Sequence, residues 1–222
     1  MSLARFAQVI DATDIRLDEA CLAMSSAIQR PLDEIEWLAA LDLLAAECPT
    51  PTAVGIADYL FGEQGFRGNT RAYYDWRNSC LDQVIETRVG IPISLSVLMI
   101  EVARRLDVQL AGVAMPAHFL VRTVDEPERF FDPFAAGVEL DAHGARELFN
   151  TVTRGQVDWQ ESFLEQSSAR SIVIRMLNNL RAIFQSRSDE MLLGLVMEMR
   201  AQIPQLALTE HDEIEWATAV FN

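Results

Sequence analysis

The sequence predicts an α+β fold in which a buried central helix packs against a small antiparallel sheet, with further helices before and after this core. Three observations carry the prediction: helical periodicity over the first 70 residues, a long apolar helix in the middle, and short β-type runs after it. Turn signals separate those runs at Met115-Pro116, Asp125-Glu126-Pro127 and Ala135-Ala136-Gly137. Short strands this close together favour an antiparallel sheet packed on the helix.

The first part, residues 1–70, reads as helical. The run from Leu17 to Met24 is amphipathic, and acidic residues lie in its first turn. Pro31 suits the opening of the next helix, because the missing N–H costs nothing there. The apolar residues of that helix predict its buried stripe, which would consist of Ile35, Leu38, Ala39, Leu41 and Leu44.

The middle part, residues 71–155, would hold the core. A helix is predicted over 91–106, with Pro92 in its first turn and Ser94 or Ser96 as hydrogen-bond partners for free N–H groups. Apolar side chains lie nearly all round this helix, which indicates a central position. Strands are predicted at 109–115, 118–124, 129–132 and 138–140.

The last part, residues 156–222, is again helical by periodicity. Helices are expected over 169–185 and 189–202, and a short one over 210–220. The chain is therefore expected to have a helical part, a core and a helical cap, divided at residues 70 and 155.

Composition limits the kinds of partner. The formal net charge of −15 argues against nucleic acid or an anionic membrane surface, since both attract a basic face. The longest apolar-rich stretch, 91–100, is too short for a bilayer span of about 20 residues, and the N-terminus lacks the features of a signal peptide. Three scattered cysteines without a CxxC motif fit the reducing cytoplasm. With three histidines and no HExxH motif, neither a metal nor another cofactor is expected.

A possible active site follows from chain order. A helix start near Gly90 is followed by His118 on a predicted strand and by Asp132 at the end of another. In a Cys-His-Asp site the thiolate sits at a helix N-terminus, the histidine takes the thiol proton, and the aspartate fixes the imidazole tautomer. His118 and Asp132 fit the last two roles, and a hairpin could bring them together. Alternatively, His118 is a core or surface residue that happens to precede an Asp-Pro turn.

The cysteine expected at the helix start is missing. Ser94 lies near the first helical turn, where it could act as a nucleophile or as a capping residue. Cys80 is the nearest thiol and reads either as a nucleophile or as a small buried hydrophobic residue.

Several separated motifs resemble one family. They are LFGEQGFRGNTRAYYDWRNSCLDQVIETRVGIPISLSVLMIEVARRLDVQLAGVAMPAHFLVR, then FFDPFAAG, then IRMLNNLRAIF. In this order they closely resemble the bacterial Sir regulator B-type proteins of the transglutaminase-like superfamily. The segment MLNNLRAIFQSRSDEMLLGLVMEMRAQIP resembles one tetratricopeptide helix pair, which would pack on the main domain as a cap.

The resemblance implies a cysteine-protease-like core and a displaced nucleophile. Aligned without a gap, Pro92 takes the place of the catalytic cysteine, whereas a two-residue shift places Ser94 there. His118 and Asp132 match the other two members of the triad. The expected function is therefore a non-catalytic domain that binds a peptide or protein partner. The alternatives are a hydrolase or acyltransferase that uses Ser94, His118 and Asp132, or a purely structural scaffold.

Overall fold

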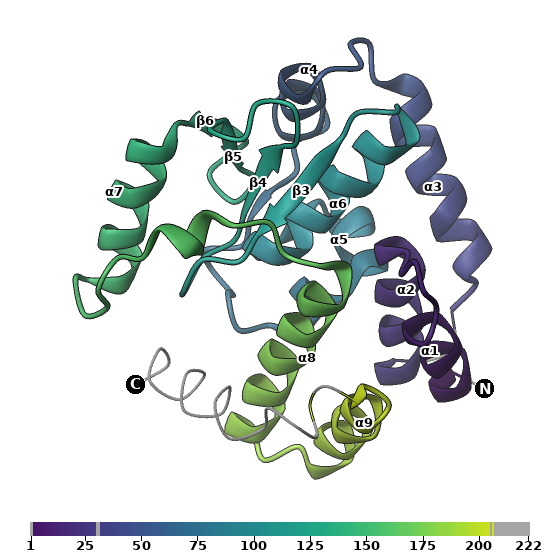
Figure 1. Ribbon diagram of the computed structural model, residues 1–222. Helices are drawn as coiled ribbons and strands as arrows, with labels where there is room; N and C mark the ends of the chain where they lie inside the picture. The colour runs from purple at the N-terminus through teal and green to yellow at the C-terminus, as the bar shows by residue number, and fades with distance from the viewer. Residues whose placement is uncertain (1, 30–31, 205, 207–222) are drawn as a thin grey trace.

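The computed structural model describes residues 2–29, 32–204 and 206 (Figure 1). Its helices are α1 (Ser2–Ile10), α2 (Leu17–Ile28), α3 (Glu34–Glu47), α4 (Ala53–Ala57), α5 (Leu81–Thr87), α6 (Pro92–Arg105), α7 (Ala142–Thr153), α8 (Ala169–Ser186) and α9 (Glu190–Ala201). Shorter helical segments are the π-helix η1 (Asp58–Glu63) and the 3-10 helices η2 (Trp76–Ser79) and η3 (Glu161–Leu164). The strands are β1 (Arg67–Gly68), β2 (Val89–Gly90), β3 (Leu110–Val113), β4 (Leu120–Thr123), β5 (Phe130–Asp132) and β6 (Val138–Leu140).

The main sheet is an antiparallel meander in the order β3-β4-β5-β6. Gly112 pairs with Val121, and Phe131 pairs with Glu139. A separate two-stranded parallel pair joins β1 to β2, directly before α6. A mixed fold with a small antiparallel sheet confirms the predicted α+β class.

Both faces of the sheet are covered, because successive side chains on a strand point to opposite sides. On β4 and β5, Val121 and Phe131 join the large core that contains α6. Their neighbours Leu120 and Phe130 join a smaller core with Phe149 of α7. Figure 1 shows α7 on one side of the strands, and α1, α2 and α3 on the other side beyond α6.

Helix α6 is central, as its apolar composition predicted. It packs against β3, β4, α2, α3 and α8, and most of its side chains are buried. Pro92 occupies its first turn, and Arg104 and Arg105 lie in its last turn, where the helix dipole favours cations. This helix sets the position of the sheet and of the loop that precedes it.

Two details of the helical prediction were wrong. Helix α3 begins at Glu34 behind the N-cap Asp33, and Pro31 lies outside the described residues. Ile35 is 77% exposed rather than part of the buried stripe, whereas Leu41 is fully buried. Helix α7 had no predicted counterpart. Asp141 starts it by accepting a hydrogen bond from the Gly144 N–H at 2.7 Å.

Helices α8 and α9 pack against each other and are joined by a short turn. The large core draws side chains from Phe6 to Leu206, so it includes all three predicted parts of the chain. The division at residues 70 and 155 and the tetratricopeptide resemblance stay predictions. The short helix expected over 210–220 lies outside the described residues. Within the described part of the chain, no helix has both the length and the apolar character needed to cross a bilayer.

A buried ion cluster ties α2 to the end of α6. The Asp18 carboxylate, 1% exposed, accepts hydrogen bonds from Arg104 at 3.0 Å and Arg105 at 2.8 Å. Both arginines also bind Glu101. Burial opposes the ionisation of Asp18, but the hydrogen bond and charge of Arg105, the Glu19 N–H and the charge of Arg104 together lower the pKa of Asp18. Burial, followed by the charge of Asp18, raises the pKa of Glu101.

The pKa of Asp18 is lowered and that of Glu101 is raised, so removing the charge of each side chain should change the stability differently. The stability that protonated Glu101 contributes is present below its unfolded pKa of about 4.3 and is lost as the pH rises through its folded pKa. The contribution of Asp18 is present above about pH 3.9 and is lost as the pH falls. We therefore expect Glu101→Gln to destabilise the protein less than Asp18→Asn at pH 7, as measured by urea unfolding. An equal or larger loss for Glu101→Gln would contradict this assignment.

Candidate functional site

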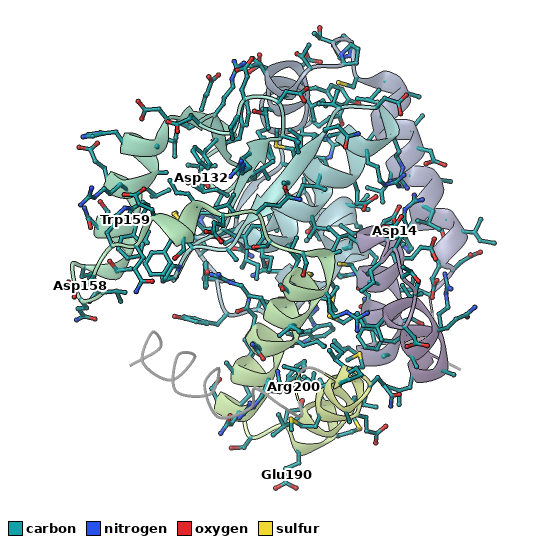
Figure 2. The ribbon with its side chains drawn as sticks, in the orientation of Figure 1. Asp14, Asp132, Asp158, Trp159, Glu190 and Arg200 are labelled. Carbon is teal, nitrogen blue, oxygen red and sulfur yellow. The ribbon has the colours of Figure 1, made fainter. Side chains whose placement is uncertain are left out.

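The structure brings His118 and Asp132 into direct contact. His118 Nε2 lies 2.9 Å from Asp132 Oδ2, and the two residues are 6% and 3% exposed. The other carboxylate oxygen, Oδ1, accepts hydrogen bonds from the backbone N–H groups of Phe134 and Ala135 at 3.0 and 3.2 Å. Figure 2 labels Asp132 beside the strands. The carboxylate is thus fixed by its own turn, and it orients the imidazole through Nε2.

His118 lies in the turn before β4 rather than on the strand, which corrects its predicted position. The preceding residue, Ala117, has a φ of 61°, in the left-handed region that an alanine rarely adopts. Arg175 of α8 donates a hydrogen bond from Nη2 to the His118 carbonyl oxygen at 2.8 Å. Among the described residues, none forms a hydrogen bond with the Nδ1 atom of His118. This nitrogen is therefore the ring atom left for a ligand or a proton transfer.

Aromatic rings connect His118 to the loop before η2. The His118 ring packs edge-on to Phe134, with centroids 6.1 Å apart, and Phe134 in turn packs edge-on to Tyr73 at 5.9 Å. Tyr73 also contacts Tyr74, with centroids 5.2 Å apart. Gly68 of β1 leaves room for this arrangement, because a Cβ there would lie 2.6 Å from the Phe134 ring.

Ser94 is not hydrogen-bonded to His118 but belongs to the helix start. Its hydroxyl is fully buried, accepts from the Ile91 N–H at 3.1 Å and donates to the Asn78 carbonyl oxygen at 2.6 Å. The Asn78 side chain donates to the carbonyl oxygens of Ala72 and Tyr73 at 2.7 and 3.0 Å. Ser94 thereby fixes the Tyr73 loop to α6. Its nucleophilic role stays a prediction.

The other candidate nucleophiles are equally enclosed. Pro92 opens α6 and offers no nucleophilic atom. Cys80 is 0% exposed, and burial, followed by the charge of Asp82, raises the pKa of its thiol. Burial also raises the pKa of Cys21, and Cys48 is buried as well. A buried thiol with a raised pKa carries little thiolate, so Cys21 and Cys80 are poor nucleophiles at neutral pH.

A cavity of about 370 Å³ lies beside the start of α6. Its walls come from the Tyr73 loop, the N-cap of α6 and one face of α8, and consist of Tyr73, Tyr74, Ile91, Asn179, Ala182, Ile183 and Ser186. Since Tyr73 both lines this cavity and contacts Phe134, the cavity is separated from His118 by aromatic rings. We call it the α8 cavity.

Sequence reasoning did not single out Tyr73, Asn179 or Arg175 as site residues. They come from outside the strand segment, and nothing in residue periodicity links them to His118. One sequence feature could have pointed to them: the motifs that contain Tyr73-Tyr74 and Asn178-Asn179 both contribute to the family resemblance. Among the described residues, no group of three or more His, Cys, Asp or Glu side chains is placed to hold a metal ion.

Part of the chain is similar to known bacterial and eukaryotic proteins. It is 45% identical over 130 residues to a UPF0162 protein of Xylella fastidiosa, a match that covers 57% of this chain and 46% of that protein. A UPF0162 protein of Pseudomonas aeruginosa is 34% identical over 127 residues, with the same coverage. The matches thus span about half the length of these curated relatives. Mouse F-box only protein 21 is 46% identical over 90 residues, which cover 36% of this chain and 14% of that protein.

No solved structure matches the chain significantly. The family model described as "Transglutaminase-like superfamily" matches residues 17–178. That span includes α2, the Tyr73 loop, α6, the whole antiparallel sheet and the first half of α8. It therefore contains Tyr73, Ser94, His118, Asp132 and Arg175, whereas the α8 wall of the cavity, from Asn179 to Ser186, lies beyond it. On this match, the chain belongs to the transglutaminase-like superfamily.

Proposed function

We propose that this chain is a non-catalytic transglutaminase-like domain that binds a peptide or protein partner in the α8 cavity. One observation carries the proposal: the Ser94 hydroxyl donates its hydrogen to the Asn78 carbonyl oxygen, 2.6 Å away, inside the core. Ser94, which a two-residue shift places at the nucleophile position, thus has a structural role. We also propose that the chain is a Sir regulator B-type protein and that it acts in the bacterial cytoplasm.

Acyl transfer at a site of this kind needs a nucleophile at the start of the helix and a base beside it. The base is available, because Asp132 orients His118. The nucleophile is not, because Pro92 lacks one and the cysteines are buried. For Ser94 to attack a substrate, its hydroxyl would have to abandon the Asn78 and Ile91 bonds, each contributing about 1 kcal/mol.

The cavity supports the binding part of the proposal. Its volume of about 370 Å³ lies in the range of about 300–1,000 Å³ that is usual for ligand pockets. Its walls combine the rings of Tyr73 and Tyr74 with the polar side chains of Asn179 and Ser186. Aromatic walls with a few polar groups suit the side chain of a bound peptide. No cofactor enters this function.

The free Nδ1 atom of His118 favours a second candidate, a hydrolase or acyltransferase that uses Ser94, His118 and Asp132. In that case Ser94 would rotate toward the imidazole during the reaction. The two candidates differ in one observable property, which is the reactivity of Ser94.

Labelling with a fluorophosphonate, followed by intact-mass and peptide mass spectrometry, tests this difference. We expect no adduct on wild type, because the buried hydroxyl is neither accessible nor activated. Ser96→Ala provides a matched control, since Ser96 is also fully buried on α6. An adduct present in wild type and Ser96→Ala but absent in Ser94→Ala would overturn the non-catalytic proposal.

The binding function is tested with a phage-displayed library of random heptapeptides. Ala182→Phe would fill the α8 cavity, whereas Ala201→Phe adds the same ring at an exposed position of α9. We expect wild type and Ala201→Phe to enrich the same peptides, and Ala182→Phe to lose them. Enrichment that is unchanged by Ala182→Phe, or the absence of any enrichment, would contradict binding in this cavity.

A further inference from the structure

Helix α8 is basic although the chain as a whole is acidic. The segment 168–187 holds Arg170, Arg175, Arg181 and Arg187 and has no Asp or Glu, whereas the net charge of the chain is −15. Three of the 18 basic residues thus lie on the helix that forms a wall of the α8 cavity, and a fourth, Arg187, is its C-cap. A local concentration of one charge against the overall sign indicates a partner of the opposite charge.

Two of these arginines lack a carboxylate partner within the described part of the chain. Arg175 donates to the His118 carbonyl oxygen at 2.8 Å and lies over the Phe119 ring, 5.7 Å from its centroid. Arg187 donates to the Tyr74 carbonyl oxygen at 2.8 Å. Neither contact supplies a negative charge, and no ion pair of the described residues includes either arginine. Burial, opposed by Tyr73, lowers the pKa of Arg175 to about 10, as expected for a cation without an acidic neighbour.

Arg175 and Arg187 come before and after the cavity-lining residues of α8 in the chain, although neither lines the cavity itself. Asn179, Ala182, Ile183 and Ser186 recur at helical spacing and line the cavity. Arg175 precedes Asn179 by one turn, and Arg187 follows Ser186. At 1.5 Å per residue, Arg175 and Arg187 are about 18 Å apart along the helix axis. An extended peptide of about five or six residues spans that length.

We infer that the α8 cavity binds an acidic peptide segment, whose apolar or aromatic side chain enters between Tyr73, Tyr74 and α8. Carboxylates about five residues apart on that segment pair with Arg175 and Arg187. This inference rests on the proposed function and adds the chemistry of the partner. The guanidinium N–H groups not used for the two carbonyl oxygens are the donors for these carboxylates.

The rest of the surface favours a peptide over a nucleic acid. A second cavity, between the β4–β5 turn and the end of β6, is lined by Glu126, Glu128, Glu139 and Asp141 with Arg129. Such acidic surfaces and the net charge of −15 repel a continuous polyphosphate, whereas a short acidic peptide needs only the basic face.

The test uses fluorescence polarisation of the full chain with fluorescein-labelled synthetic peptides. One peptide has two glutamates about five residues apart with a phenylalanine between them. Its counterparts carry glutamine or lysine instead of glutamate. We expect the glutamate peptide to bind at least about tenfold more tightly than the glutamine peptide, and to bind more weakly as salt is added.

Variants of the protein test whether the peptide carboxylates contact α8. Arg187→Glu is expected to weaken binding of the glutamate peptide about tenfold, while Arg154→Glu, the same change at an exposed position after α7, leaves it unaltered. Equal affinities for the glutamate and glutamine peptides, or equal effects of the two variants, would overturn the inference. Loss of glutamine-peptide binding in Ala182→Phe would still support the proposed function in that case. Binding of a single-stranded oligonucleotide in preference to the peptides would also overturn it.

Discussion

Asp18→Ala is expected to lower the free energy of unfolding by about 3–5 kcal/mol, as measured by urea unfolding at pH 7. The reason is that Asp18 is 1% exposed and holds the guanidinium groups of Arg104 and Arg105. Removing the carboxylate leaves positive charge at the junction of α2 and α6 without its central partner, and Glu101 with its raised pKa is a poor replacement.

Asp42→Ala serves as the matched control for this prediction. Its carboxylate also binds Arg105, at 2.7 Å, but the side chain is 69% exposed. Because water screens and replaces such a pair, the expected loss is below about 1 kcal/mol. If both variants lose the same stability, burial is not what gives the Asp18 cluster its effect.

Asp132→Ala is expected to lower the free energy of unfolding by about 3 kcal/mol. The substitution removes the partner of His118 Nε2 and leaves the N–H groups of Phe134 and Ala135 without their buried acceptor. An unsatisfied buried group costs about 1–3 kcal/mol, so most of the loss comes from His118, while Phe134 is half-buried and Ala135 is exposed to water. Urea unfolding gives the stability, and the NMR resonances of the His118 ring report the loss of its orientation.

Asp141→Ala is the control, because Asp141 also accepts a backbone N–H, that of Gly144, but at the exposed start of α7. Loss of one exposed cap costs about 1 kcal/mol. A similarly small loss for Asp132→Ala, with unchanged His118 resonances, would contradict the view that Asp132 fixes this imidazole.

Much of the core was predictable because its patterns are local. The apolar residues of 91–106 nearly surround the helix, and burial on all sides requires such a composition. The turn signals between residues 115 and 137 marked where the strands end. Proline and glycine favour turns through their own backbone properties, so this signal depends little on the rest of the fold. Helix α7 was missed because its buried side is narrow: Ala145, Phe149 and Thr153 are its buried residues.

The buried side of α3 could not be read from its sequence. Apolar residues lie all round this helix, so several stripes were equally compatible with the pattern. The neighbours α2, α5 and α6 cover one side, which buries Leu41 and Ala45 but leaves Ile35 and Leu43 exposed. Packing partners, and not hydrophobicity alone, selected the stripe.

Sequence by itself determined the α+β class, the central helix and the chain order that places His118 before Asp132. The first two follow from periodicity and turn residues, which are properties of a few neighbouring residues. The third follows from the order of the motifs, which is read directly along the chain. Only the tertiary structure decided what the Ser94 hydroxyl does, because its partner is the carbonyl oxygen of Asn78, 16 positions away. The same holds for Arg175, which reaches the His118 carbonyl across 57 positions. Hydrogen bonds between distant segments depend on how helices pack, and no local pattern of residues encodes their direction.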